Sequence, residues 1–100
     1  MKKVRLLPNE VQVIFESIRK RGIDSVICLY GSRIDLDLKG GDINLYVISE
    51  LISFKDKLDI LGDIQSGIGD QRIDLKIQSK LSAMVDLFFQ SISKVDLSDL

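Results

Sequence analysis

Two segments of the chain alternate between apolar and more polar side chains, and this alternation limits the folds that are open to it. In residues 42–48 the apolar side chains of Ile43, Leu45 and Val47 recur at every second position, and residues 72–77 repeat the pattern. A period of two is typical of β-strands that bury one face. The chain is therefore predicted to pack one face of a sheet against helices and to open a polar cleft on the other face.

The remaining elements follow from apolar spacing and from glycine and proline positions. The patterns predict a helix from Pro8 to just before Gly22, a buried strand over 25–30, a short helix over 33–38, a turn at 40–41, a helix over 54–65 and a last helix over 81–92. This order predicts an α/β (α+β) fold, with a small mixed sheet of three or slightly more strands and helices on one face. One hundred residues allow a single domain, residues 1–100.

Further expectations concern two apolar stripes and the C-terminal tail. Phe54, Leu58 and Leu61 are predicted to form the buried stripe of the helix over 54–65. The buried stripe expected for the last helix consists of Leu81, Met84, Val85 and Phe88. Residues 95–100 are expected to fray or to dock on a partner.

Composition excludes several classes of chemistry. The chain has no histidine and a single cysteine, Cys28, so histidine triads, zinc sites built on Cys or His, and an intrachain disulfide are not available. A net charge of -1 argues against general nucleic-acid binding. The chain shows neither a membrane-spanning apolar stretch of roughly 20 residues nor an apolar signal segment, so a cytoplasmic protein is expected.

Polar residues at the ends of the predicted strands suggest a metal and nucleotide site. Gly31 and Ser32 end the first strand, and a glycine–serine turn can donate backbone N–H and hydroxyl groups to phosphate. Asp42 and Asn44 share one strand face, and Asp74 lies on the later alternating strand. Oxygen ligands of this kind suit Mg²⁺, which takes one or two carboxylates together with phosphate oxygens. Ser32 could equally cap the following helix, and the acidic residues could simply be a solvated strand face.

The same residues resemble the minimal nucleotidyltransferase (MNT) family of the DNA polymerase β superfamily. Its pattern is Gly-Ser, about ten residues, Asp-x-Asp, and a third Asp on a later strand; here nine residues separate Ser32 from Asp42. The resemblance implies Mg²⁺-dependent transfer of a nucleoside monophosphate from ATP or another NTP to a hydroxyl acceptor. It also implies that Ser32 binds phosphate, that Asp42 binds metal, and that Asp74 acts as base or ligand. Arg33 is then a candidate for phosphate contact or for packing.

Asn44 departs from this pattern, because it stands where the family has its second metal-binding aspartate. Loss of that charge is expected to weaken transfer, since catalysis depends on stabilising the phosphoryl charge. Two further interpretations remain open. In the first, the chain is a non-catalytic antitoxin-like module that binds a helical HEPN-type toxin or a second copy of itself. In the second, it is an unrelated α/β domain with coincidental Gly-Ser and Asp residues. Enzymatic activity is therefore left open at this point.

Overall fold

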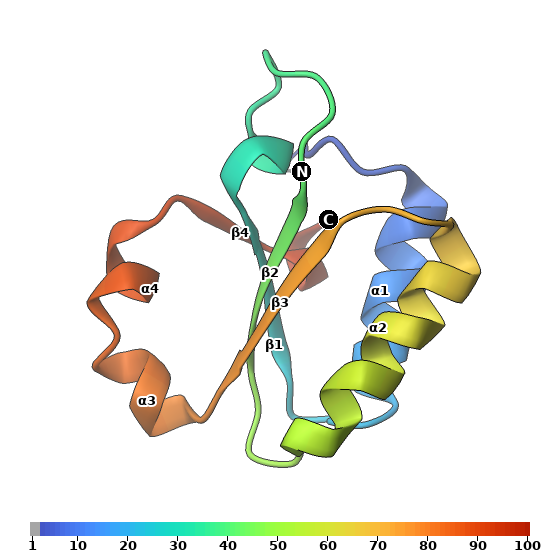
Figure 1. Cartoon of the computed structure of the whole chain (residues 1–100). Coiled ribbons are helices and arrows are strands. Elements are labelled where there is room, and N and C mark those ends of the chain that lie inside the picture. Colours follow the sequence, from blue (N-terminus) through green and yellow to red (C-terminus); the bar gives the residue numbers. More distant parts are fainter. Residues whose placement is uncertain (1–2) are drawn as a thin grey trace.

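The computed structural model describes residues 3–100 and has the predicted mixture of helices and strands (Figure 1). The elements are α1 (Pro8–Arg19), β1 (Val26–Tyr30), the 3-10 helix η1 (Gly31–Ile34), β2 (Ile43–Ile48), α2 (Phe54–Ile68), β3 (Ile73–Gln78), α3 (Lys80–Met84), α4 (Leu87–Ser91), β4 (Lys94–Asp96) and the 3-10 helix η2 (Leu97–Asp99). The α/β class is confirmed. The short helix expected over 33–38 is wrong in position, because the helical turn is η1 and the loop after it is irregular.

The four strands form one open mixed sheet in the order β3-β2-β1-β4. β1 is antiparallel to both of its neighbours, β2 and β4. β2 and β3 are parallel, with α2 as the crossover between them. Parallel neighbours need such a long connection, and here the connection also covers one face of the sheet. The central position of β1 and β2 agrees with the burial of nearly all their side chains.

The main core lies between the sheet and the helix pair α1 and α2, on the right of Figure 1. Ile14 and Ile18 of α1 and Ile60 and Ile64 of α2 are completely buried in it. The predicted stripe of α2 is therefore wrong: Phe54 and Leu58 are 88% and 75% exposed, while Leu61 only borders the core. The helix has apolar residues on more than one side, and its packing against α1 and the sheet decides which of them are buried. A Ser53–Asp56 capping box fixes where α2 begins.

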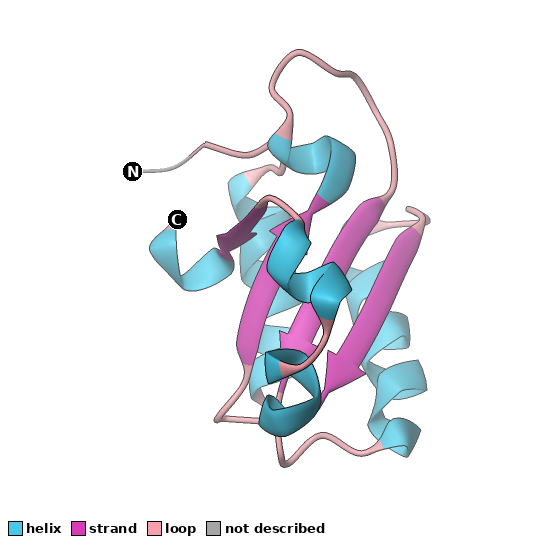
Figure 2. Cartoon of the chain, turned by 90° about the vertical axis from the view of Figure 1, so that its left-hand side faces the viewer, coloured by secondary structure: helices cyan, strands magenta, loops and turns pink. Residues whose placement is uncertain are grey.

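The second face of the sheet carries a smaller cluster beneath α3 and α4, which lie in front of the sheet in Figure 2. Cys28, Tyr30, Tyr46 and Ala83 form this cluster, with Phe89 packed against it. Helices thus lie on both faces of the sheet, so the prediction that they lie on one face is wrong, and the predicted polar cleft is partly covered.

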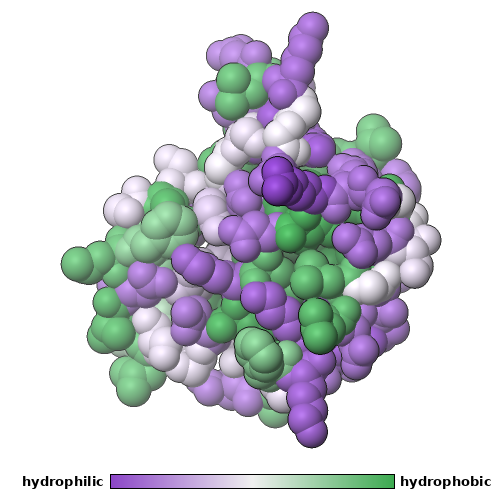
Figure 3. Space-filling view, viewed as in Figure 1, coloured by the Kyte–Doolittle hydropathy of each residue, from purple (hydrophilic) through white to green (hydrophobic). Residues whose placement is uncertain are grey.

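The single helix predicted over 81–92 is wrong, because the chain breaks into α3 and α4 at Val85 and Asp86. The Asp86 side chain accepts a hydrogen bond from the backbone N–H of Phe88 and so caps a new helix. The predicted stripe fails with it: Leu81, Met84 and Val85 are 70%, 64% and 72% exposed. Figure 3 shows apolar side chains projecting on this side of the molecule, at the left.

The C-terminal residues are part of the fold, so the expectation of a frayed tail is wrong. β4 pairs with β1, and the following Leu97 is only 2% exposed within the main core. Within residues 3–100, no helix combines the length and the apolar character needed to cross a membrane.

Candidate metal and nucleotide site

A row of polar side chains crosses three strands at the end of the sheet where β2 and β3 begin. The strand register places Tyr30 opposite Asn44, and Asn44 opposite Asp74. Opposed residues of a ladder point to the same face, and neighbouring strands lie about 4.8 Å apart. Asp42 lies immediately before β2, two residues from Asn44. Asp42 and Asp74 are exposed, whereas Asn44 is half-buried. The ladder thus places Asn44 and Asp74 on the same face of the sheet.

The Gly31-Ser32 turn lies against one end of this row. Gly31 has a left-handed φ of 81°, and a Cβ atom added to it would come within 2.5 Å of Nδ2 of Asn44. A Cβ atom added to Gly41 would come even closer to the hydroxyl of Ser32, so the loop before β2 and the turn after β1 are in contact. Ser32 is not the cap of η1, because that position belongs to Tyr30. Gly31 and Ser32 therefore lie beside the start of β2, with Gly31 next to the side chain of Asn44.

Arg33 is occupied by contacts within the protein. Its Nε donates to the carbonyl of Gly41 (3.0 Å), one terminal nitrogen to the carbonyl of Arg5 (2.9 Å), and the other to Oε1 of Gln71 (3.1 Å). Gln71 in turn donates to the buried carboxylate of Glu10. The guanidinium therefore holds the loop before β2 to α1 and to the start of β3. Between the two roles considered for Arg33, the geometry favours packing over phosphate contact.

Arg5 reinforces the same turn from the N-terminal segment. Its side chain donates to the carbonyls of Ser32 (2.6 Å) and Asp35 (2.8 Å), and its backbone N–H donates to the carbonyl of Arg33 (2.7 Å). These bonds satisfy carbonyl groups of a short helix that has few internal partners. Sequence reasoning did not find this contact, because the two segments lie about 30 residues apart and show no local pattern.

Charges near the row are mixed. Burial raises the pKa of Tyr30, and the carboxylate of Asp74 raises it further. The ammonium group of Lys76 lies 4.5 Å from the centre of the Phe88 ring, on the face shared with Asp74. The site thus contains carboxylates and an amide, and the ammonium group of Lys76 lies over an aromatic ring nearby.

The donor set suits Mg²⁺ better than it suits a metal ion whose ligands all come from the protein. Within residues 3–100 no group of three or more His, Cys, Asp and Glu side chains is gathered to hold a metal ion. Asp42, Asn44 and Asp74 offer two carboxylates and an amide oxygen. Mg²⁺ commonly uses one or two carboxylates and completes its shell with water and substrate phosphate. The residues therefore suit an ion that arrives with a nucleotide.

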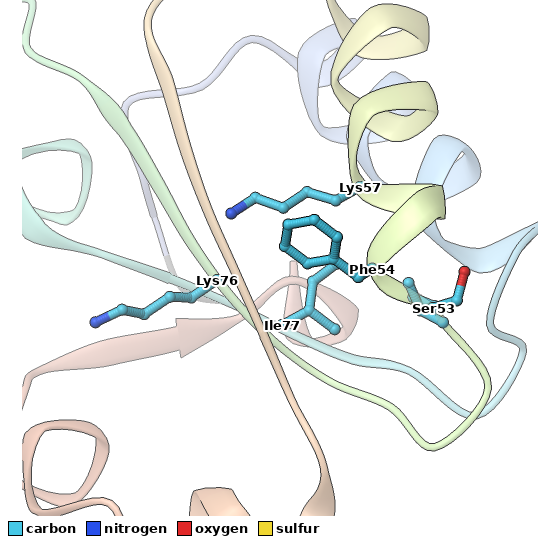
Figure 4. Close-up of a pocket in the computed structure, with 6 residues that line it drawn as sticks. Ser53, Phe54, Lys57, Lys76 and Ile77 are labelled. Carbon is cyan, nitrogen blue, oxygen red and sulfur yellow. The ribbon is translucent and has the colours of Figure 1, made fainter.

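A separate hollow, at the edge of β3 beside the start of α2, carries no comparable chemistry (Figure 4). Its volume is about 220 Å³, below the roughly 300 Å³ at which ligand pockets usually begin. The Ser53 hydroxyl there is already bonded to Asp56. Figure 4 shows the amino end of Lys76 directed away from this hollow, across β3.

Comparison with models of known protein families and with curated protein sequences gives no match for this chain. Its function is therefore inferred from the geometry of its own residues.

Proposed function

We propose that the chain is a nucleotidyltransferase-like domain of the cytoplasm that binds ATP or another NTP with Mg²⁺ and retains weak transfer activity. The observation that supports this most directly is the strand register, which sets Asn44 beside Asp74 and next to the Gly31-Ser32 turn. Sequence spacing alone could not require that these residues meet.

Each residue has a role in this proposal. Asp42, Asn44 and Asp74 would hold Mg²⁺, which when bound neutralises charge on the phosphates. The Ser32 hydroxyl and backbone N–H groups of the turn donate to phosphate oxygens. The acceptor hydroxyl gives its proton to Asp74 and forms a bond to the α-phosphorus, while the bond to the departing pyrophosphate breaks. Asn44 supplies an oxygen without charge, so this step is slow.

The test is calorimetric titration with Mg²⁺–ATP of the natural protein and of Asn44→Asp. We expect Asn44→Asp to bind more tightly, by at least the roughly tenfold that even outer-shell partners of a metal contribute to affinity. Asp42→Asn should abolish the Mg²⁺-dependent part of ATP binding. Asp59→Asn is the matched control, because Asp59 is an exposed carboxylate on α2, away from the site. Absence of Mg²⁺-dependent binding in both the natural protein and Asn44→Asp would refute the proposal.

A second candidate function is a binding module for a helical HEPN-type toxin or for a second copy of the chain. The observation that favours it is the exposure of Leu81, Met84, Val85 and Leu87 along α3 and α4. Apolar patches of this kind often mark protein interfaces. Light scattering of the purified chain tests self-association. Co-expression with the product of the neighbouring gene tests the other partner. A strict monomer that forms no complex in co-expression would exclude this function.

A further inference from the structure

A groove lies between η1 and α4, directly beside the Gly31 turn. Its volume is about 630 Å³, and its lining includes Tyr30, Gly31, Ile34, Asp35, Phe88 and Ile92. Ligand pockets commonly measure about 300–1,000 Å³. The groove therefore has room for a small organic ligand, and Gly31 belongs both to its wall and to the turn that contacts Asn44.

Aromatic and apolar side chains form most of the inner wall. Phe88 packs against Tyr30 in an edge-to-face arrangement, with ring centres 5.5 Å apart, and stays 41% exposed. Tyr30 is held by the sheet beneath it and is only 8% exposed. The Phe88 ring is thus positioned by a rigid neighbour, and the ammonium group of Lys76 lies over it, 4.5 Å from the ring centre. The part of the ring that stays exposed offers apolar surface to a flat aromatic ligand.

Asp35 makes the two ends of the groove chemically different. It is an exposed carboxylate, and one of its oxygens accepts the backbone N–H of Asp37 (3.0 Å). A carboxylate repels phosphate but accepts hydrogen bonds from sugar hydroxyls or ring amino groups. A ligand with an anionic end and a hydroxyl-bearing aromatic end would therefore place its anionic end at Gly31 and the other end along Asp35 and Phe88.

We propose that this groove holds the nucleoside part of the triphosphate, with the base against Phe88 and the sugar near Asp35. The inference rests on the proposed function, which places the phosphates and Mg²⁺, and it adds a binding site for the nucleoside next to them. Tyr30, Gly31, Asp35 and Phe88 join the residues that bind substrate. The sequence predicted Phe88 as part of the buried stripe of the last helix.

The experiment compares three probes by titration and ligand-observed NMR: Mg²⁺–tripolyphosphate, Mg²⁺–ATP and adenosine without metal. We expect ATP to bind more tightly than tripolyphosphate, and adenosine to bind weakly. Phe88→Leu keeps an apolar contact with Tyr30 and removes the ring. It should weaken the binding of ATP by about tenfold, within the range that base–aromatic contacts contribute, and leave the binding of tripolyphosphate unchanged. Phe54→Leu, at an 88% exposed phenylalanine on α2, is the matched control and should change neither affinity.

The outcomes separate the two proposals. Equal affinity for ATP and tripolyphosphate, or an equal loss of both in Phe88→Leu, would overturn the nucleoside groove while leaving the metal site in place. If adenosine is the only one of the three probes that binds, and Phe88→Leu abolishes its binding, the groove is supported and the metal site is refuted. If none of the three probes binds, both proposals fail.

Discussion

The buried hydroxyl of Tyr46 donates a 2.6 Å hydrogen bond to Oδ2 of Asp86, and this contact fastens the start of α4 to the middle of the sheet. The other oxygen of Asp86 accepts the backbone N–H of Phe88. One carboxylate therefore caps the start of α4 and satisfies a tyrosine hydroxyl that is shut away from water. It also fixes the position of Phe88, which lines the groove beside η1.

Tyr46→Phe should lower the free energy of unfolding by about 1 kcal/mol, the usual net contribution of one hydrogen bond. The ring and its packing on Phe89 remain, so the loss reports the hydroxyl alone. Chemical denaturation measures it. A double-mutant cycle with Asp86→Ala separates this contact from the helix cap, and strictly additive effects would show that the two side chains do not interact.

Stability should fall on acidification below about pH 4. The hydrogen bond from Tyr46 lowers the pKa of Asp86, and the hydrogen bond from Ser49, with one from the Glu50 backbone, lowers that of Asp24; both lie below the ordinary value of 3.8. A carboxyl group whose pKa is lower in the folded than in the unfolded protein stabilises the folded state at pH values above its unfolded pKa. That contribution is lost as pH falls through the folded pKa. Denaturation at a series of pH values measures the effect, and Tyr46→Phe should reduce it. Equal stability at pH 3 and pH 6 would contradict the assignment.

The orientation of α2 can be tested with one matched pair of variants. Ile64→Ala removes a completely buried side chain and should cost about 2–5 kcal/mol of unfolding free energy. Leu58→Ala removes a side chain that is 75% exposed and should stay within about 0.5 kcal/mol of the natural protein. Both measurements use denaturant unfolding. The reverse ranking would mean that the helix buries the stripe of Phe54 and Leu58 instead.

Gly31→Ala should disturb the candidate site more than Gly40→Ala. Both glycines have left-handed backbone angles, with φ of 81° and 62°, so each substitution carries a backbone cost of about 1–2 kcal/mol. Only at Gly31 would the added Cβ press on Asn44, whereas the space at Gly40 is open. We expect Gly31→Ala alone to weaken Mg²⁺–ATP binding, as measured by calorimetry. Equal loss in the two variants would show that the turn does not support Asn44.

Local pattern was enough to predict the helices before β1 and between β2 and β3, as well as strands β1 to β3, to within three residues at each end. The shared buried face of Ile43, Leu45 and Val47 follows from the same reasoning, because side-chain alternation belongs to the strand itself. The contact of Arg33 with Gln71 could not be predicted, since the partners lie 38 residues apart and neither belongs to a periodic pattern.

The sequence by itself determined the α/β class, the buried faces of β2 and β3, and the residue types available for chemistry, because these depend on the period and nature of neighbouring side chains. The tertiary structure alone decided that Asp74 stands beside Asn44, that Leu97 closes the core through a fourth strand, and that Ile60 and Ile64 face inward in place of Phe54 and Leu58. Those outcomes depend on contacts between segments far apart in the chain, where close packing selects one among several locally equivalent arrangements.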